Sequence, residues 1–386
     1  MTDFIAQHRR DDVSALALAR HRYASMSDED FRWALQQIDG WQRTEHKLPE
    51  IAQNGEWWYP VRVSCEQCSS EAAAKYKAEV LRNMHLPSGS ILADLTGGFG
   101  IDTWYMHKQI SRTEYIERDA ELCRIAAHNF GADIAIHHSD AISYLTSHPT
   151  PDVLYIDPAR RNTNGNKVFL IEDCEPDMTQ ILPLIPASTI IMLKLSPMLD
   201  ISAAINTLGG IWQTHVVAIN NEVKEVLLVR HPNPGTTITA VDLKQTISFS
   251  FSRTKEASAQ PQYANLDDLA PDKLHYLYEP NVALLKAGAY NLLSERYGVH
   301  KLAPNTHLYA SAQQVVDFPG KTFVIREIGL RLQALKGMRV NVITRNYPMR
   351  ADQLRASARL SDGGEQYIIG TRVGQTPILL LADRLA

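Results

Sequence analysis

The sequence predicts an α/β fold whose central sheet is mostly parallel, with a helical region before it and a smaller α+β region after it. From about residue 90, short apolar runs alternate with helical stretches, as in "SILADL" followed by "DTWYMHKQI". This alternation is typical of parallel strands with helices on both faces. The segment "HVVAINNEVKEVLLVRH" is interpreted as two strands joined at Asn220–Asn221, which predicts a reversed strand at the end of the sheet.

Length and composition indicate a globular protein of several domains. The 386 residues are too many for one ordinary core. The net charge is -4, so any contact with nucleic acid has to come from a local basic patch. We expect no signal or membrane segment, and four cysteines are too few for a disulfide scaffold, which together predict a cytoplasmic location.

Helices are expected through the first ninety residues. Ser27 can cap a helix with an acidic first turn, and residues 69–84 form a second helix that Pro87 and Gly89 end. Further strands are expected at 90–95, 112–118, 133–139, 152–158, 188–196, 237–243 and 247–253, and further helices at 102–110, 119–130, 140–148 and 282–298. A linker is expected at 255–265.

The glycine-rich stretch "DLTGGFGIDT" follows the first strand of the predicted sheet, at the edge where open parallel sheets bind their ligands. Gly98 and Gly100 supply G-x-G, but Thr103 stands where the dinucleotide fingerprint requires its third glycine. The P-loop pattern is also absent from the sequence. A purely structural turn is the alternative interpretation of this stretch.

Acidic residues stand at the ends of four successive predicted strands: Asp94, Glu117, Asp140 and Asp157. Any one of them could be a helix cap or a solvated acid. With the glycine turn, however, the series resembles the class I S-adenosylmethionine-dependent methyltransferases over roughly residues 69–231. The resemblance implies S-adenosyl-L-methionine as the cofactor, whose ammonium and sulfonium groups favour nearby carboxylates.

The same resemblance implies roles for individual residues. Glu117 is expected to bind the ribose hydroxyls and Asp140 the adenine amine. Thr96 replaces the usual first glycine, and we expect its hydroxyl or backbone to face the methionine end of the cofactor. The full expected cofactor set is Asp94, Thr96, Gly97, Gly98, Phe99, Gly100, Glu117, Arg118, Asp140, Ala141 and Asp157.

"DPARR" occupies the position of the catalytic D-P-P-x motif of that family. Asp157 and the carbonyl of Pro158 are expected to accept hydrogen bonds from the reacting nitrogen. The missing second proline and aromatic argue against an adenine N6 enzyme, and D-P-A-R is closer to the D-P-P-R of some RNA methyltransferases. Methylation at uracil C5 is rejected, because Cys174 lies in an acidic run that would blunt a thiolate nucleophile.

Three basic residues near Asp157 have two interpretations each. Arg160 and Arg161 could clamp a phosphate or stack on a base, or they could pair with nearby acids. Lys194 ends the fifth strand and could contact substrate or neutralise Asp157. Cys65 and Cys68 make only half a zinc site, so no metal is predicted, and their segment can instead fold over the cofactor crevice.

The segment 331–360 carries seven basic residues and one acid. Its candidate RNA-binding residues are Arg339, Arg345, Arg350 and Arg355, and a solvated face without a partner is the alternative. The layout resembles a bacterial family of methyltransferases with a C-terminal THUMP-like domain, which implies a structured RNA substrate. The expected regions are N-terminal helices at 1–68, a methyltransferase domain at 69–233, a connecting ferredoxin-like region at 234–313 and a THUMP-like domain at 314–386.

The sequence therefore predicts a methyltransferase that acts on a base nitrogen in tRNA or rRNA. The alternatives are a small-molecule or protein methyltransferase, and a non-catalytic RNA-binding protein that retains a vestigial cofactor fold.

Overall fold

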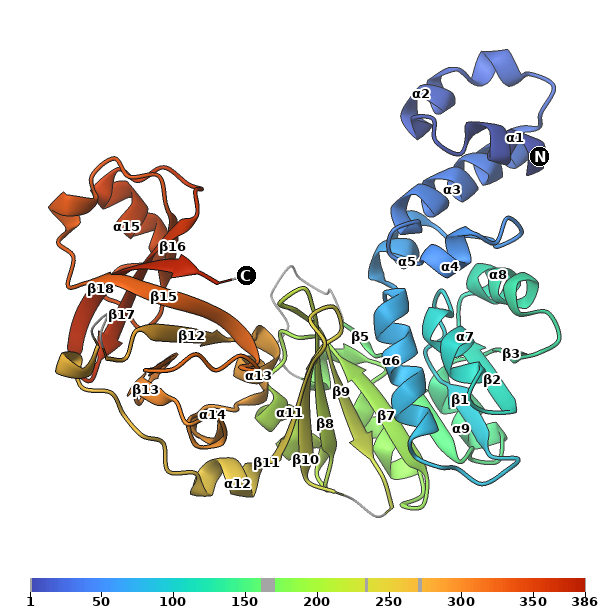
Figure 1. Cartoon of the computed structure of the whole chain (residues 1–386). Helices are drawn as coiled ribbons and strands as arrows, with labels where there is room; N and C mark the ends of the chain where they lie inside the picture. The colour runs from blue at the N-terminus through green and yellow to red at the C-terminus, as the bar shows by residue number, and fades with distance from the viewer. Residues whose placement is uncertain (1, 161–170, 233–234, 270–272, 386) are drawn as a thin grey trace. The chain divides into compact units, whose positions relative to one another are not determined.

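The computed structural model describes residues 2–160, 171–232, 235–269 and 273–385. The chain divides into two compact units (Figure 1). Unit 1 comprises residues 1–212 and 226–235, and unit 2 comprises residues 213–225 and 236–386. One of the three boundaries between the units falls within the strand β9 (Glu222–Arg230).

Unit 1 holds six strands of a nine-stranded sheet, wholly or in part, in the order β3-β2-β1-β4-β7-β9. Neighbouring strands are parallel except for β7 and β9, which are antiparallel. The predicted parallel sheet with a reversed last strand is thereby confirmed. The bounds of its other strands are β1 Ile91–Asp94, β2 Arg112–Glu117, β3 Ala135–His138, β4 Val153–Ile156 and β7 Ile190–Leu195. A separate two-stranded sheet pairs β5 (Ala159–Arg160) with β6 (Cys174–Glu175).

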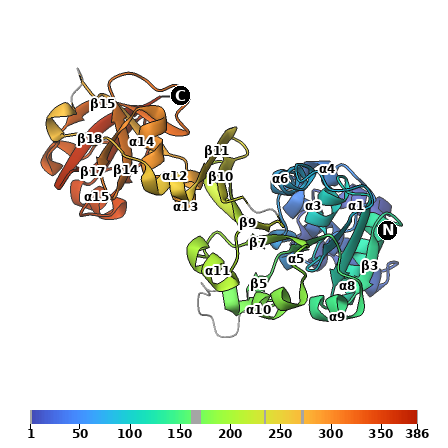
Figure 2. The same ribbon diagram turned by 90° about the horizontal axis from the view of Figure 1, so that it is seen from below.

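Helices cover both faces of this sheet. In Figure 2, α6 lies on one side of it, and α9 and α10 lie on the other. The helices are α6 Glu71–Arg82, α7 Ile101–His107, α8 Ala120–Phe130, α9 Ala141–Ser147, α10 Met178–Ile181 and α11 Ile201–Leu208. Side-chain caps fix several starts, since Ser70 accepts from the N–H of Ala73 and Asp119 from that of Leu122.

The N-terminal helices share a core with this sheet. They are α1 Thr2–His8, α2 Val13–Leu18, α3 Asp28–Thr44, α4 Pro49–Ala52 and α5 Arg62–Gln67. Ser27 caps α3 by accepting a 3.0 Å hydrogen bond from the N–H of Asp30, as the sequence predicts. Trp41 of α3, Ile51 of α4 and Cys65 of α5 belong to the same buried cluster as Leu92 of β1, so these three helices and the sheet form one packed body.

Unit 2 begins with β8 (Gln213–Ile219), which leads through Asn220 and Asn221 into β9. Both asparagines have positive φ, 54° and 59°, as the predicted tight turn requires. β8 pairs in parallel with β10 (Thr237–Asp242), which pairs antiparallel with β11 (Ile247–Ser252).

The rest of unit 2 is built on a seven-stranded sheet of order β13-β14-β12-β15-β18-β17-β16. Its strands are β12 Tyr276–Pro280, β13 His300–Ala303, β14 Thr306–Ser311, β15 Gly320–Ile328, β16 Asn341–Thr344, β17 Gln366–Val373 and β18 Thr376–Arg384. Its helices are α12 Arg253–Ser258, α13 Val282–Ala287, α14 Asn291–Tyr297 and α15 Ala351–Ala358.

Two predictions for unit 2 are wrong in detail. The single helix expected at 282–298 is two helices, because Gly288 adopts φ 83° and ends α13. The expected linker at 255–265 is partly helical, since Ser252 caps α12 by accepting from the N–H of Lys255. Among the described residues, no helix is long and apolar enough to cross a membrane.

Candidate active site

Parallel register brings the ends of β1, β2 and β4 to one level. Asp94 pairs with Tyr115 of β2 and with Tyr155 of β4. The residues two positions beyond these three are Thr96, Glu117 and Asp157. Three sequence-predicted residues therefore meet at the carboxyl edge of the sheet, where open α/β folds bind ligands.

The glycine turn packs closely against aromatic rings of the core. A Cβ at Gly97 would lie 2.2 Å from the ring of Tyr115, and one at Gly100, where φ is 80°, would lie 2.4 Å from the ring of Phe130. Phe99 is buried among these core residues. Its side chain thus anchors the turn, and any contact of Phe99 with a cofactor would have to come from its backbone.

Asp94 lies beneath the turn, and its exposed fraction is 1%. One carboxylate oxygen accepts from the N–H of Thr96 at 3.0 Å, and the other accepts from the hydroxyl of Thr103 at 2.5 Å. Burial raises the pKa of Asp94 to about 7, although the hydrogen bonds from Thr103 and Thr96 act in the opposite direction. The Thr96 hydroxyl lies 3.3 Å from an Asp94 oxygen and accepts from the N–H of Asp157 at 2.7 Å. Thr96 therefore joins the turn to the end of β4.

Glu117 stands beside the turn at the end of β2. It accepts a 2.9 Å hydrogen bond from the N–H of Gly98 and another of 2.9 Å from the N–H of Asp119. These bonds fix the carboxylate next to the glycines and leave it acceptor capacity for hydroxyl groups. The neighbouring Arg118 side chain is exposed and pairs with Glu175 at 2.5 Å.

Asp140 begins α9 as its N-cap. It accepts from the N–H of Ser143 at 2.9 Å and from the Ser143 hydroxyl at 2.6 Å. These hydrogen bonds lower the pKa of Asp140, so the exposed group is a carboxylate at neutral pH. Ala141 is buried behind it. Capping accounts for Asp140 structurally, and its role toward an adenine amine stays a prediction.

Asp157 forms an ion pair with Lys194. The register of β4 and β7 places Ile156 beside Leu193, and one residue further on Lys194 Nζ lies 2.5 Å from Asp157 Oδ2. The exposed side-chain fractions are 12% for Lys194 and 36% for Asp157, so the carboxylate is the more accessible member. Of the two roles left open for Lys194, the structure shows the pairing with Asp157. Pro158 is buried directly after it.

A second buried ion pair lies behind this edge and was missed by the sequence analysis. Lys77 of α6 has an exposed fraction of 0%, and its Nζ lies 3.3 Å from Asp102 Oδ1 at the start of α7. Asp102 Oδ2 accepts from the hydroxyls of Ser69 at 2.8 Å and Tyr155 at 2.6 Å. Lys77 is four residues from both Ala73 and Leu81, so its position on the buried face of α6 was the available signal.

Burial alone would raise the pKa of Asp102, but the charges of Lys77 and Lys194 and the hydrogen bond from Tyr155 hold it below its usual value. Asp102 is therefore an anion in the first turn of α7. Lys77 compensates the charge of Asp102, so Asp94 and Glu117 are the carboxylates next to the glycine turn that favour a cationic ligand with hydroxyl groups over a pyrophosphate. The acidic edge thus suits the ammonium, sulfonium and ribose hydroxyls of S-adenosylmethionine.

The remaining predicted groups near the edge fall into two sets. Arg160 lies in β5, and Arg161 lies outside the described residues, so both interpretations of these arginines, as a phosphate clamp or as partners of nearby acids, stay predictions.

Burial raises the pKa of the Cys65 thiol to about 12, and it raises the pKa of Cys68 as well. Within the described ranges, no group of three or more metal-ligating side chains is present.

Two of the four C-terminal arginines predicted to bind RNA are engaged by acids. Arg345 pairs with buried Glu279 at 2.5 Å, and Arg355 pairs with Asp362 at 3.1 Å. Arg339 and Arg350 are exposed, and no ion pair engages either of them within the described part of the chain.

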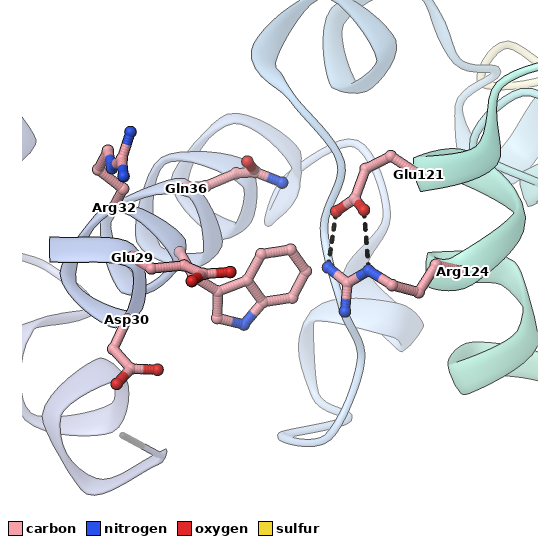
Figure 3. Close-up of a pocket in the computed structure, with 7 residues that line it drawn as sticks. Glu29, Asp30, Arg32, Gln36, Glu121 and Arg124 are labelled. Carbon is pink, nitrogen blue, oxygen red and sulfur yellow. Dashed lines mark hydrogen bonds and ion pairs between the residues drawn. The ribbon is translucent and has the colours of Figure 1, made fainter. Parts of the chain in front are cut away.

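A surface groove lies between α3 and α8 (Figure 3). Its lining residues are Glu29, Asp30, Arg32, Trp33, Gln36, Glu121 and Arg124. Arg124 binds Glu121 through two nitrogens, at 2.6 and 2.8 Å, and its guanidinium lies 4.5 Å from the ring centre of Trp33. The contact between Arg124 and Trp33 joins α8 to α3, and none of the predicted site residues lines the groove.

Comparison with known proteins was made at the level of domains and of whole structures. The family model of a ferredoxin-like domain matches residues 276–319, and that of a THUMP domain-like region matches residues 320–384. A search of curated proteins found no match.

The crystal structure of a "putative methyltransferase" from Porphyromonas gingivalis W83 matches with a TM-score of 0.81 and 32% sequence identity, covering 100% of this chain and 97% of that chain. The 16S rRNA N2 G1207 methyltransferase of T. thermophilus, in complex with AdoMet and guanosine, matches at 16% identity and a TM-score of 0.33, covering 41% of this chain and 42% of that one. At these values the second likeness carries no weight for the activity.

The strand order, the reversed last strand and the C-terminal matches define the fold of class I methyltransferases followed by a THUMP-like region. This chain belongs to the family of the P. gingivalis protein, in agreement with the resemblance seen in the sequence.

Proposed function

We propose that the protein is an S-adenosylmethionine-dependent methyltransferase that acts on a base nitrogen in tRNA or rRNA. The observation that carries the proposal is the Asp157–Lys194 pair, which stands in register with the glycine turn and Glu117. A carboxylate for the substrate and a turn for the cofactor are thereby brought to one edge of the sheet.

Asp157 and Pro158 have the chemistry to orient a nitrogen nucleophile. The Asp157 carboxylate accepts a hydrogen bond from an amino group, and the carbonyl of Pro158 offers a second acceptor. Two such bonds would turn the nitrogen lone pair toward the glycine turn. Lys194 Nζ lies 2.5 Å from Asp157 Oδ2, so it holds the carboxylate in place and leaves the other oxygen to accept from the substrate. S-adenosylmethionine, when bound, supplies an electrophilic methyl group.

The RNA substrate is supported by the C-terminal region. Its THUMP-like match covers residues 320–384. The resemblance to methyltransferases that carry such a domain implies an RNA substrate. Exposed Arg339 and Arg350 lie in this match and offer charge for phosphate groups. The small-molecule and protein substrates remain as outcomes of the test.

Calorimetry with S-adenosylmethionine tests the first half of the proposal. We expect wild type and Asp157→Ala to bind it with Kd values within about threefold of each other, because Asp157 serves mainly the substrate. Methyl transfer from labelled cofactor to total RNA of cells lacking the gene should fall about 100-fold or more in Asp157→Ala. Glu222→Ala, which breaks the surface ion pair with Lys224, is the matched control and should leave both values unchanged.

An absence of cofactor binding by the wild type would reject the enzyme and favour the RNA-binding protein with a vestigial fold. Binding without transfer to RNA would favour a small-molecule or protein substrate. Equal turnover in wild type and Asp157→Ala would remove Asp157 from the mechanism. Mass spectrometry of nucleosides from cells with and without the gene would identify the modified base.

A further inference from the structure

A closed circuit of hydrogen bonds joins the glycine turn to the strand that carries Asp157. On one side, the N–H of Asp157 donates to the Thr96 hydroxyl at 2.7 Å, and the N–H of Thr96 donates to Asp94 at 3.0 Å. Asp94 also accepts from the Thr103 hydroxyl at 2.5 Å, which brings the circuit to the start of α7.

The other side of the circuit returns from α7 to β4. Asp102, the residue before Thr103, accepts from the Tyr155 hydroxyl at 2.6 Å. Tyr155 lies on β4 two residues before Asp157, where the circuit closes. The two carboxyl side chains and the phenol of the circuit are almost completely buried. Their exposed fractions are 1% for Asp94, 8% for Asp102 and 1% for Tyr155.

Asp102 is further tied to α6, outside the circuit. Lys77 supplies the countercharge 3.3 Å away and also donates to the Ser69 hydroxyl at 3.2 Å, and Ser69 donates to Asp102 at 2.8 Å. A buried ion pair of this kind holds its surroundings in one arrangement, since separating its members leaves an uncompensated charge. The start of α7 is therefore fixed against two neighbouring elements.

We infer that Tyr155, Asp102 and Lys77 are positioning residues, which hold the glycine turn in its cofactor-binding shape relative to Asp157. The inference rests on the proposed function, because it assigns these side chains to the same site. Their hydroxyl, carboxylate and ammonium groups lie behind the edge and act through Thr96 and Asp94. The circuit predicts that its two sides are energetically coupled even though Tyr155 and Thr96 belong to different segments.

The experiment compares two Tyr→Phe variants that each lose one hydroxyl-to-carboxylate hydrogen bond made by a buried tyrosine. Tyr155→Phe breaks the circuit, whereas Tyr144→Phe breaks the 2.5 Å bond from α9 to Glu114, outside it. Both tyrosines have an exposed fraction of 1%, so similar losses of thermal stability are expected. Calorimetry should show S-adenosylmethionine binding weakened about fivefold in Tyr155→Phe and by less than about twofold in Tyr144→Phe.

A double-mutant cycle with Thr96→Val tests the coupling. If Thr96→Val alone weakens binding about fivefold, the double variant Thr96→Val/Tyr155→Phe should lose clearly less than the roughly 25-fold that independent effects would give. Kd values that are equal for the two Tyr→Phe variants, or a fully multiplicative double variant, would overturn the circuit while leaving the proposed function intact. Absence of binding by the wild type would instead overturn the proposed function, and this inference with it.

Discussion

Asp94 combines near-complete burial with an ionisable group at the centre of the candidate site. The groups that face it act in opposite directions. Burial and the charges of Asp102 and Asp157 raise its pKa, while hydrogen bonds from Thr103 and Thr96 lower it, and the balance lies at about 7. Lys77 and Lys194 pair with those two neighbouring carboxylates. Asp94 thus changes charge near neutral pH directly beneath the glycine turn.

The affinity for S-adenosylmethionine should therefore rise with pH. At pH 6 Asp94 is mostly protonated, and at pH 8 it is mostly an anion, which attracts the sulfonium and ammonium groups. We expect Kd to fall by about threefold over this range in calorimetric titrations. The ligand's own amino group also titrates, so the comparison is with Asp94→Asn, in which the Asp94 contribution should vanish. The same pH slope in both proteins would contradict the assignment to Asp94.

At the scale of elements, local sequence patterns predicted the strands of the sheet and the acidic residues at their ends. Apolar runs that end in Glu117 and Asp157 identified both the strands and the acidic edge, because parallel strands bring their carboxyl ends together. The Lys77–Asp102 pair could not be found this way, since the partners are 25 positions apart and meet only when α6 packs on α7. The end of α13 at Gly288 could not be predicted either, because a glycine inside a helical pattern is sometimes tolerated and sometimes ends the helix.

The glycine turn offers a stability test at this scale. Gly100→Ala would strain a backbone at φ 80° and also drive a Cβ to 2.4 Å from the ring of Phe130. Gly89 has a similar φ of 88° but nothing within 4 Å of the added atom, so Gly89→Ala isolates the backbone strain. We expect Gly89→Ala to cost about 1–2 kcal/mol and Gly100→Ala about 1–3 kcal/mol more, measured by urea unfolding. Equal losses would show that the contact with Phe130 relaxes without cost.

At the scale of the whole molecule, residues 276–384 of unit 2 form one continuous body. The ferredoxin-like and THUMP-like matches meet at residue 320, yet β12 of the first pairs with β15 of the second. Buried Glu279 of β12 reinforces this joint by pairing with Lys321 at 3.1 Å and with Arg345 at 2.5 Å. Arg345 therefore stabilises this joint, and its role toward RNA stays a prediction.

Arg339 and Arg350 are the best remaining candidates for phosphate contacts, because both are exposed and no acid within the described residues pairs with them. Each phosphate contact contributes about 0.7 to 0.9 to the slope of log affinity against log salt concentration. The double variant Arg339→Ala/Arg350→Ala should thus bind total tRNA more weakly and with a slope smaller by about 1.5. Filter binding at salt concentrations between roughly 50 and 200 mM measures both the RNA affinity and its salt slope, because affinity falls steeply over this range.

The control removes the same charge from unit 1. Arg10 and Arg82 are 78% and 62% exposed at their side chains, so Arg10→Ala/Arg82→Ala lowers the net charge equally without touching the THUMP-like domain. If the C-terminal arginines contact the RNA phosphates, only Arg339→Ala/Arg350→Ala changes the slope of log affinity against log salt concentration. Counterion release depends on the number of phosphates contacted and not on the total charge. Equal changes in both variants would mean that the overall field attracts the RNA, and an unchanged slope in the first would remove Arg339 and Arg350 from the interface.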